Sequence, residues 1–151
     1  MEANGWQLFI HPLLRSQLET LTQRVAKLAS GDPRSYQAHP AAKLLSTINY
    51  YIREGIPRDP NAPEFRQGNA LGPGNRHWFR AKLHGRYRLF YRFSTQQRIV
   101  IYAWVNDEHS LRKSGSKTDP YARFKALLDR GQPPESFSAL LSASQAIDPE
   151  H

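Results

Sequence analysis

The residues best suited to chemistry lie in residues 78–104, where basic and aromatic side chains alternate along the sequence. The alternation has the period of two that is typical of half-buried strands. In residues 78–83 and again in 87–93, one side of each strand is apolar and the other carries the arginines and lysine. Residues 99–104 are apolar on both sides, as expected for a central strand. The pattern therefore predicts a sheet with one basic face.

The register between the first two strands decides whether these basic residues share a surface. A two-residue turn at His84-Gly85 places Lys82 and Arg88 on opposite faces, whereas a three-residue loop pairs them directly. Only the three-residue loop keeps every apolar residue of both strands on one face, and register generally follows the buried pattern. That surface gathers Arg80, Lys82, Arg88, Phe90 and Arg92, and Tyr102 and Trp104 are expected beside them.

The crowding of positive charge predicts an anionic ligand. Like charges opposite each other across strands destabilise a sheet, so a sheet that carries four of them is expected to meet an anion. The net charge of +8 is concentrated in the same region: residues 1–75 carry +2, residues 76–130 carry +9, and residues 131–151 carry −3. Such concentration is typical of a nucleic-acid footprint, and a generally basic surface is the plainer alternative.

Helices are expected on both sides of this segment. A short strand in residues 4–12 precedes a helix with an apolar stripe over residues 14–28, which Gly31-Asp32-Pro33 ends. A second helix is expected over about residues 40–53. Both are expected to cover one face of the sheet and leave the other to the basic residues. A last helix begins at Asp119-Pro120 and ends at Gly131.

The rest of the chain sets the fold class and the compartment. We expect an α+β domain in residues 1–131 and a tail in residues 132–151 that is a candidate short helix. Residues 56–75 hold four prolines and three glycines, which predicts a long irregular connection. The chain has no cysteine, which excludes disulfides and thiolate chemistry. No leader and no membrane-length apolar run is evident, so we expect a cytoplasmic protein with no membrane partner.

Familiar catalytic motifs are absent from the sequence. It contains no P-loop, no GxGxxG and no HExxH. Metal binding is an alternative, because His77 and His84 are candidate ligands and Asp107-Glu108-His109 places three more in a row. Adjacent residues rarely point at one centre, however, and no second cluster has recognisable ligand spacing. We therefore expect no metal and no other cofactor.

The residues that are present suit phosphodiester chemistry on RNA. A basic sheet interleaved with aromatic rings is able to hold phosphates and stack unpaired bases. RNA carries its own nucleophile, the 2′-hydroxyl, so cleavage needs a base, cations for the transition state and an acid. Arginine does not lose its proton, which makes Lys82 the candidate base. Tyr121 is a candidate acid or base, and a core aromatic of the last helix is its alternative reading.

A longer series of motifs runs in order over roughly residues 4 to 134. It includes Asn4-Gly5-Trp6, His11-Pro12, Lys43-Leu44-Leu45, Phe65-Arg66, Gly85-Arg86-Tyr87-Arg88-Leu89-Phe90, Asn106-Asp107-Glu108, Leu111-Arg112, Lys117-Thr118-Asp119 and Pro133-Pro134. In these motifs the chain resembles the YhaV toxins, the partners of PrlF-type antitoxins, within the RelE superfamily of bacterial mRNA interferases.

The resemblance implies a fold and a function. The fold is RelE-like, with two N-terminal helices packed on a small antiparallel sheet, a C-terminal helix, and an RNA-binding face opposite the two helices. The function is that of a toxin of a type II toxin–antitoxin system, a ribosome-dependent endoribonuclease that cleaves mRNA without metal and inhibits translation. The implied partners are a PrlF-type antitoxin, mRNA and the ribosome, with operator DNA as a ligand of the toxin–antitoxin complex.

The resemblance also implies roles for individual residues. The superfamily's second-strand basic pair matches Arg80 and Lys82, its third-strand arginine matches Arg88, and its C-terminal tyrosine matches Tyr121. The connection before the tyrosine is longer here, so Arg112, Lys113 and Lys117 compete to supply the last cation. The predicted catalytic set is Arg80, Lys82, Arg88, Arg112, Lys117 and Tyr121, and the predicted RNA-binding set is Arg86, Phe90, Arg92 and Trp104.

Two other functions are compatible with the same residues. A non-catalytic module that binds RNA or the ribosome needs the same electrostatics, because charge gives affinity without chemistry. A basic face that receives an acidic protein partner is the second alternative, and such a complex should weaken steeply as salt rises. New 2′,3′-cyclic or 3′-phosphate ends on RNA distinguish an enzyme from both.

Overall fold

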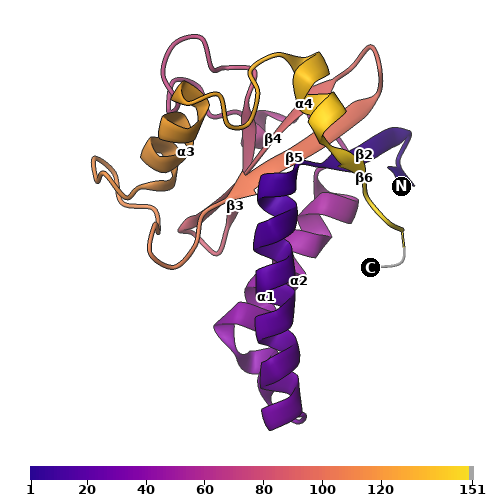
Figure 1. The fold of residues 1–151 in the computed structure, drawn as a ribbon, viewed down its shortest axis with the longest axis vertical. Coiled ribbons are helices and arrows are strands. Elements are labelled where there is room, and N and C mark those ends of the chain that lie inside the picture. The colour runs from indigo at the N-terminus through magenta and orange to yellow at the C-terminus, as the bar shows by residue number, and fades with distance from the viewer. Residues whose placement is uncertain (150–151) are drawn as a thin grey trace.

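The computed structural model describes residues 1–149, which form an α+β fold with four α-helices and a mixed sheet of six strands (Figure 1). In chain order the elements are β1 (Glu2–Ala3), β2 (Trp6–Ile10), α1 (Pro12–Gly31), α2 (Pro40–Tyr50), β3 (Phe79–Leu83), β4 (Tyr87–Ser94), β5 (Ile99–Val105), α3 (Pro120–Asp129), α4 (Phe137–Ala143) and β6 (Gln145–Ala146). Within residues 1–149, no helix is long and apolar enough to cross a membrane.

The sheet has the strand order β1-β2-β5-β4-β3, and β6 pairs with β2. β4 is antiparallel to both of its neighbours, but β2 runs parallel to β5, so the expectation of a wholly antiparallel sheet is wrong. Parallel neighbours require a long crossover connection. Here α1, α2 and the β3–β4 hairpin provide it. The chain also begins with strands, and its two long helices follow β2.

The register of the β3–β4 hairpin is the one predicted from the buried pattern. Leu83 pairs with Tyr87 and Lys82 pairs with Arg88, which confirms the three-residue loop. His84 and Gly85 both adopt positive φ, 47° and 76°, and glycine adopts such a conformation without the steric cost of a Cβ. This turn places Arg80, Lys82 and Arg88 on the same face of the sheet.

Both long helices begin at a His-Pro pair. The Nδ1 atom of His11 accepts a hydrogen bond from the Leu13 N–H at 3.2 Å, and that of His39 accepts one from the Ala41 N–H at 3.1 Å. Each proline occupies a first-turn position where its missing N–H costs nothing. The two histidines are therefore helix caps. From these starts, α1 and α2 form a hairpin that extends away from the sheet (Figure 1).

The first hydrophobic core lies between this helical hairpin and the sheet. It contains Trp6, Leu8, Leu14, Ile48, Ile52, Leu83, Leu89, Tyr91, Val100 and Tyr102 among others. The hydroxyl of Tyr102 donates to the Ile52 carbonyl at 2.7 Å, and burial raises the pKa of this phenol well above its usual range. The expectation that Tyr102 lies on the basic face is wrong, because its ring is buried on the opposite side.

A second hydrophobic core covers part of the face that was expected to be open. It is built from Leu71, Trp78, Phe90, Ile101, Ala103, Tyr121, Phe124 and Leu140, and so brings α3, α4 and the connection before β3 onto the sheet. Phe90 has no exposed surface and stacks on Phe124, with ring centroids 4.4 Å apart. Only part of this face therefore remains for a ligand.

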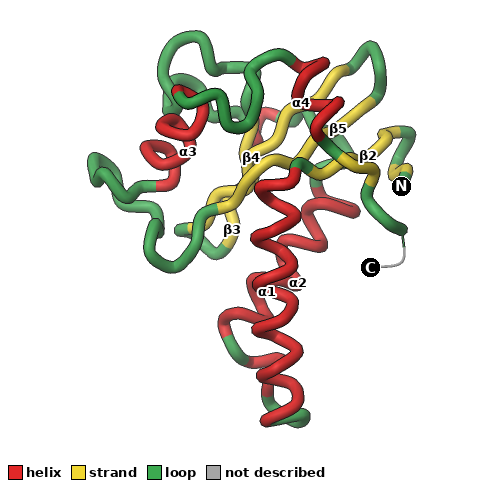
Figure 2. Tube along the Cα trace, viewed as in Figure 1, coloured by secondary structure: helices red, strands yellow, loops and turns green. Residues whose placement is uncertain are grey.

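The tail after Gln132 is packed on the same sheet as the rest of the chain. α4 inserts the fully buried Leu140 into the second core. β6 then pairs with β2, and the Ile147 carbonyl accepts a hydrogen bond from the Met1 ammonium at 2.9 Å. The two ends of the described chain therefore meet at one edge of the sheet, as Figure 2 also shows.

Candidate active site

The centre of the site is the hydroxyl of Tyr121, which two arginines hold from the sheet. The Nε–H of Arg80 donates to it at 2.8 Å and the Nε–H of Arg88 at 3.0 Å. Both arginines are largely buried, with 8% and 6% of their surface exposed. We call Arg80, Arg88, Arg112 and Tyr121 the tyrosine cradle.

Backbone carbonyls fix the other side of each guanidinium. Arg80 Nη1 donates to the Glu64 carbonyl at 2.9 Å, so the long connection before β3 contributes directly to the site. Arg88 Nη1 donates to the carbonyls of Gly85 and Tyr87, both at 2.9 Å. A buried guanidinium that is hydrogen-bonded on several sides has little freedom to move, so the cradle is preorganised for its ligand.

Arg112 lies over the ring of Tyr121, and Asp119 holds it there. The Cζ atom of Arg112 is 4.9 Å from the ring centroid, and Arg112 Nη1 is 2.6 Å from Asp119 Oδ1. The Asp119 carboxylate is 3% exposed and also accepts the N–H groups of Lys113 and Tyr121. One buried residue therefore caps α3, fixes the preceding loop and places the third arginine.

This geometry distinguishes the three cations that competed for the last position. Arg112 is half-buried against Tyr121, whereas Lys113 and Lys117 are exposed. The ammonium groups of both lysines lack a hydrogen-bond or ion-pair partner among residues 1–149. Arg112 is thus the cation that the fold brings to Tyr121, and the two lysines lie on the loop around it.

Asn106 joins the loop that carries Arg112 to the β3–β4 hairpin by hydrogen bonds. Its Oδ1 accepts the Arg88 N–H at 2.7 Å, and its Nδ2 donates to the carbonyls of Arg86 and Ser110 at 3.2 and 2.7 Å. The Arg112 N–H donates to the same Arg86 carbonyl at 2.9 Å. A side chain that is 2% exposed therefore links the strand that carries Arg88 to the loop that carries Arg112.

The Asp107-Glu108 pair supports the structure around the cradle. Asp107 Oδ1 accepts bonds from the His109 N–H at 2.9 Å and the Ser110 hydroxyl at 3.0 Å, which stabilises the turn after Asn106. Glu108 forms an exposed ion pair with Arg24 of α1 at 3.6 Å. Within residues 1–149 neither carboxylate bonds a cradle residue, so both act on the loop and on its packing against α1.

Lys82 is the unpaired cation beside the cradle. It pairs with Arg88 across the hairpin, is exposed, and has no hydrogen-bond or ion-pair partner within the described chain. Arg86 is exposed on the turn beside it, where its Nε donates to the Arg112 carbonyl at 3.3 Å. The fold thus surrounds Tyr121 with three fixed guanidinium groups and leaves one lysine free at the rim.

This arrangement suits an anion that gains charge during a reaction. A tyrosine hydroxyl both accepts and donates hydrogen bonds, and here both arginines donate to its oxygen. The hydrogen of Tyr121 is therefore left to be donated to a ligand. Charge-assisted and bidentate bonds from arginine match the geometry of phosphate oxygens. The cradle can stabilise a phosphorane-like transition state and supply it with a proton.

The predicted RNA-binding residues are less uniform in position. Trp104 is partly buried and stacks on Phe124, with ring centroids 5.6 Å apart. Phe90 is buried beneath Trp104, so the prediction that Phe90 lies on an exposed surface is wrong. Arg92 lies under the tail, with its Cζ 5.6 Å from the Trp78 ring and 5.5 Å from the Phe137 ring. Burial lowers the pKa of Arg92 and nearby Glu135 opposes this effect. Arg86 alone of this set is fully exposed beside the cradle.

Asn106 and the second role of Asp119 were missed by reasoning from sequence. Asp119 carried a helix-cap signal, because it precedes Pro120, but nothing in the sequence linked it to Arg112. Asn106 follows the last apolar strand, a position where an amide is able to bond a neighbouring backbone. In residues 1–149 no group of three His, Asp or Glu side chains is placed to hold a metal ion.

The fold and the cradle together define a small α+β protein with a preorganised cluster of basic residues, of a chemistry that suits a phosphate group. A family described as a toxin with endonuclease activity, of a toxin–antitoxin system, matches residues 8–145. The chain belongs to this family, the YhaV toxins. It is therefore a toxin with endonuclease activity, and an antitoxin is its partner.

Individual relatives agree with the family match. Toxin YhaV of Escherichia coli O6:H1 is 41% identical over 144 residues, which cover 94% of each chain. Ribonuclease toxin YhaV of Escherichia coli K12 is 42% identical over 139 residues, 91% of this chain and 90% of the relative. No solved structure matches the chain.

Proposed function

We propose that this toxin cleaves mRNA at the tyrosine cradle and thereby inhibits translation. The observation that carries the proposal is the Tyr121 hydroxyl, whose oxygen accepts hydrogen bonds from two arginines of the sheet. The name of the Escherichia coli K12 relative, a ribonuclease toxin, supports RNA as the substrate. Because RNA provides its own nucleophile, the cradle needs to supply only charge and proton transfer.

The proposed reaction follows from the placement of these groups. Lys82 removes the proton from the 2′-hydroxyl, and the 2′-oxygen attacks the adjacent phosphorus. Arg80, Arg88 and Arg112 stabilise the negative charge that develops on the phosphorane oxygens. As the bond from phosphorus to the 5′-oxygen breaks, Tyr121 donates its hydrogen to that oxygen. The products are a 2′,3′-cyclic phosphate and a 5′-hydroxyl.

The surroundings of the cradle supply the remaining contacts in this proposal. Lys113, Lys117 and Arg86 bind backbone phosphates, because they are exposed and close to the loop that positions Arg112. Trp104 is partly exposed and offers an aromatic edge to a base. Phe90 and Arg92 are not assigned contacts with RNA, because one is buried and the other is held under the tail.

The biological setting in the proposal follows the resemblance. The system is type II, the antitoxin is of the PrlF type, and cleavage takes place on the ribosome in the cytoplasm, where translated mRNA is found. The toxin–antitoxin complex binds operator DNA. The two long helices on the sheet correspond to the helices of a RelE-like domain in residues 1–131, and the mixed sheet and the packed tail are additions to it.

The test is primer extension on mRNA in a translation extract to which purified toxin is added. New 5′ ends that persist in EDTA and disappear with Lys82→Ala support a metal-independent nuclease that uses Lys82. EDTA also removes the Mg²⁺ that ribosomes need, so loss of the new ends in the extract does not test the chemistry. Purified RNA that the toxin cuts without EDTA but not with it contradicts metal-independent cleavage. Binding to ribosomes without any new ends, by the wild-type protein, favours the alternative of a non-catalytic RNA-binding module.

A further inference from the structure

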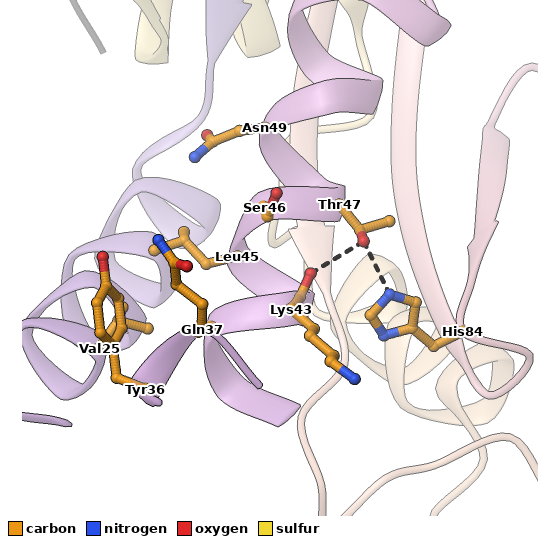
Figure 3. A pocket seen from close by; sticks show the side chains of 10 residues that line it. Val25, Tyr36, Gln37, Lys43, Leu45, Ser46, Thr47, Asn49 and His84 are labelled. Atoms are coloured by element: carbon orange, nitrogen blue, oxygen red, sulfur yellow. Dashed lines mark hydrogen bonds between the residues drawn. The ribbon is translucent and has the colours of Figure 1, made fainter. Parts of the chain in front are cut away.

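A hollow beside the β3–β4 turn shares no lining residue with the tyrosine cradle. It has a volume of about 690 Å³ and opens between the helical hairpin and the turn (Figure 3). Tyr36 and Gln37 lie on one side, Lys43 and His84 on the other, with Leu45 and Ser46 between them. We call this hollow the hairpin groove; Val25, Ala42, Thr47 and Asn49 complete its lining.

Several polar side chains without partners in the described chain line the hairpin groove. No hydrogen bond or ion pair within the described chain engages the side chains of Tyr36, Gln37, Lys43, Ser46 or Asn49. The Thr47 hydroxyl is bonded to two lining residues: it donates to the Lys43 carbonyl at 2.9 Å and lies 2.8 Å from His84 Nε2 (Figure 3). No acidic residue lines the groove. It therefore offers a cation, an aromatic ring and free amide groups to a single ligand.

The groove and the tyrosine cradle share the β3–β4 turn as a common rim. His84 lines the groove, while the Gly85 carbonyl accepts a bond from Arg88 of the cradle. His84 follows Lys82 by two residues, so the two backbone positions are at most about 7 Å apart. The space around Gly85 is open, because a Cβ built there meets nothing within 4 Å. A chain that leaves the cradle is thus able to cross the turn into the groove.

We propose that the hairpin groove binds an unpaired nucleotide of the RNA strand that continues from the cleaved phosphate. This inference rests on the proposed function and extends it to a second binding site. The Tyr36 ring stacks on the base, Gln37 and Asn49 bond its polar edge, and Lys43 binds the adjoining phosphate. Single-stranded RNA is recognised by this combination of aromatic stacking, edge bonding and backbone charge.

The lining favours RNA over a protein segment. Protein–protein contacts usually have an apolar centre that is depleted in charged residues. Here the apolar side chains, Val25, Ala42 and Leu45, are a minority of the lining. Nucleic-acid interfaces are more polar and more positively charged. The groove between α1 and α2 on the other side of the helical hairpin differs, since Asp107 and Glu108 line it together with several leucines.

The test measures binding of a short, fluorescently labelled 2′-O-methyl RNA, which lacks the free 2′-hydroxyl needed for cleavage. Tyr36→Ala should weaken binding about tenfold, which is typical of one lost stacking contact. Lys43→Gln should lower the salt dependence of the binding constant by about 0.7 in logarithmic slope, the value for one phosphate contact on a single strand. Lys27→Gln is the matched control, because Lys27 is an exposed lysine of α1 outside the groove lining.

A second arm distinguishes the substrate strand from ribosomal RNA, which offers the same chemistry. Variants that bind the oligonucleotide normally but sediment poorly with ribosomes lacking mRNA assign the groove to ribosomal RNA. The inference is overturned if Tyr36→Ala and Lys43→Gln bind the oligonucleotide and the ribosome as well as Lys27→Gln does. It is also overturned if these two variants lose only their binding to the antitoxin. In either case, normal cleavage of mRNA by the wild-type toxin still supports the proposed function. A wild-type toxin that neither binds nor cleaves RNA overturns the proposed function and the groove inference together.

Thermal unfolding of each variant checks that the groove residues act on RNA. Tyr36 is partly exposed, and Lys43 and Lys27 are exposed. All three lie outside both hydrophobic cores, so no variant should unfold at a markedly lower temperature. A Tyr36→Phe variant keeps the ring but loses the hydroxyl. It should bind RNA as wild type does, and restored binding by this variant identifies stacking as the contact.

Discussion

Arg112 and Asp119 form a 2.6 Å ion pair in which the carboxylate is almost completely buried. The same carboxylate accepts the N–H of Tyr121, so the positions of the third arginine and the tyrosine depend on one side chain. Arg112 in turn lies over the Tyr121 ring. We infer that Asp119 is a positioning residue, which acts on the reaction through Arg112 and without touching RNA.

Asp119→Asn tests this role, because asparagine is also a good helix cap but carries no charge for Arg112. We expect kcat for RNA cleavage to fall about a hundredfold with little change in KM, since a small misplacement of a group that stabilises the transition state has this effect. Asp119→Ala should also lose the cap and about 1 kcal/mol of stability. Full activity of a folded Asp119→Asn variant would show that Arg112 needs no anchor.

Tyr121→Phe removes one oxygen and leaves the ring in the second core. We expect cleavage to fall by about 10² to 10⁴, the usual contribution of a positioned proton donor, while RNA binding stays close to that of the wild type. Arg80 and Arg88 each lose a hydrogen-bond partner, which costs about 1–3 kcal/mol of stability in a buried site. Single-turnover cleavage and filter binding give the two quantities. Unchanged single-turnover rates would exclude Tyr121 as the acid.

Lys82→Ala should abolish cleavage and leave the fold intact. Lys82 is exposed and unpaired within residues 1–149, and it lies opposite Arg88, so its removal relieves repulsion between like charges. Stability should change by no more than about 0.5 kcal/mol. Lys117→Ala is the control, because this exposed loop lysine should affect affinity for RNA more than the rate. Similar losses of rate in both variants would show that charge alone matters at Lys82.

Local patterns were enough to predict the elements that carry the cradle. Only the pairing of Lys82 with Arg88 keeps the apolar residues of the two strands on one face, and the structure has this pairing. The apolar stripes predicted the two long helices over residues 14–28 and about 40–53, and the structure has them as Pro12–Gly31 and Pro40–Tyr50. These features depend on residues that are close in sequence, which is why a single sequence specifies them.

Long-range packing was not predictable in the same way. Tyr102 and Trp104 are two residues apart, so in a regular strand their side chains would lie on the same face. The pairing shifts between Phe90, which faces Trp104, and Tyr91, which faces Tyr102, so Ala103 is an extra residue that reverses the alternation. The apolar stripes of α3 and α4 likewise predicted burial, but no local signal showed that they bury Phe90.

The tail should contribute strongly to stability, although it lies outside the predicted domain boundary at residue 131. Leu140 is fully buried in the second core, so Leu140→Ala should cost about 2–5 kcal/mol. Ser142→Ala, on the exposed side of the same helix, should change stability by no more than about 0.5 kcal/mol. Urea unfolding measures both. Equal midpoints for the two variants would mean that the tail folds independently of the sheet.

Stability should fall as the solution becomes acidic, partly because of the cap of α1. His11 is buried and its Nδ1 accepts the Leu13 N–H, which only the neutral ring can do. Burial lowers the pKa of His11 in the folded protein below its ordinary value of 6.5. Between these two pKa values the unfolded chain binds the proton more readily, so stability is complete above about pH 6.5 and is lost as the pH falls below it.

His11→Asn separates the cap from its titration, because asparagine accepts the same hydrogen bond and does not ionise in this range. Urea unfolding from about pH 7.5 to 5 should show a shallower decline for His11→Asn than for the wild type, by at most about 1.4 kcal/mol per pH unit for one proton. Some decline should remain, since burial and Arg92 also lower the pKa of His77, with Glu135 opposing them. Identical slopes in the two proteins would show that His11 is not a source of acid sensitivity.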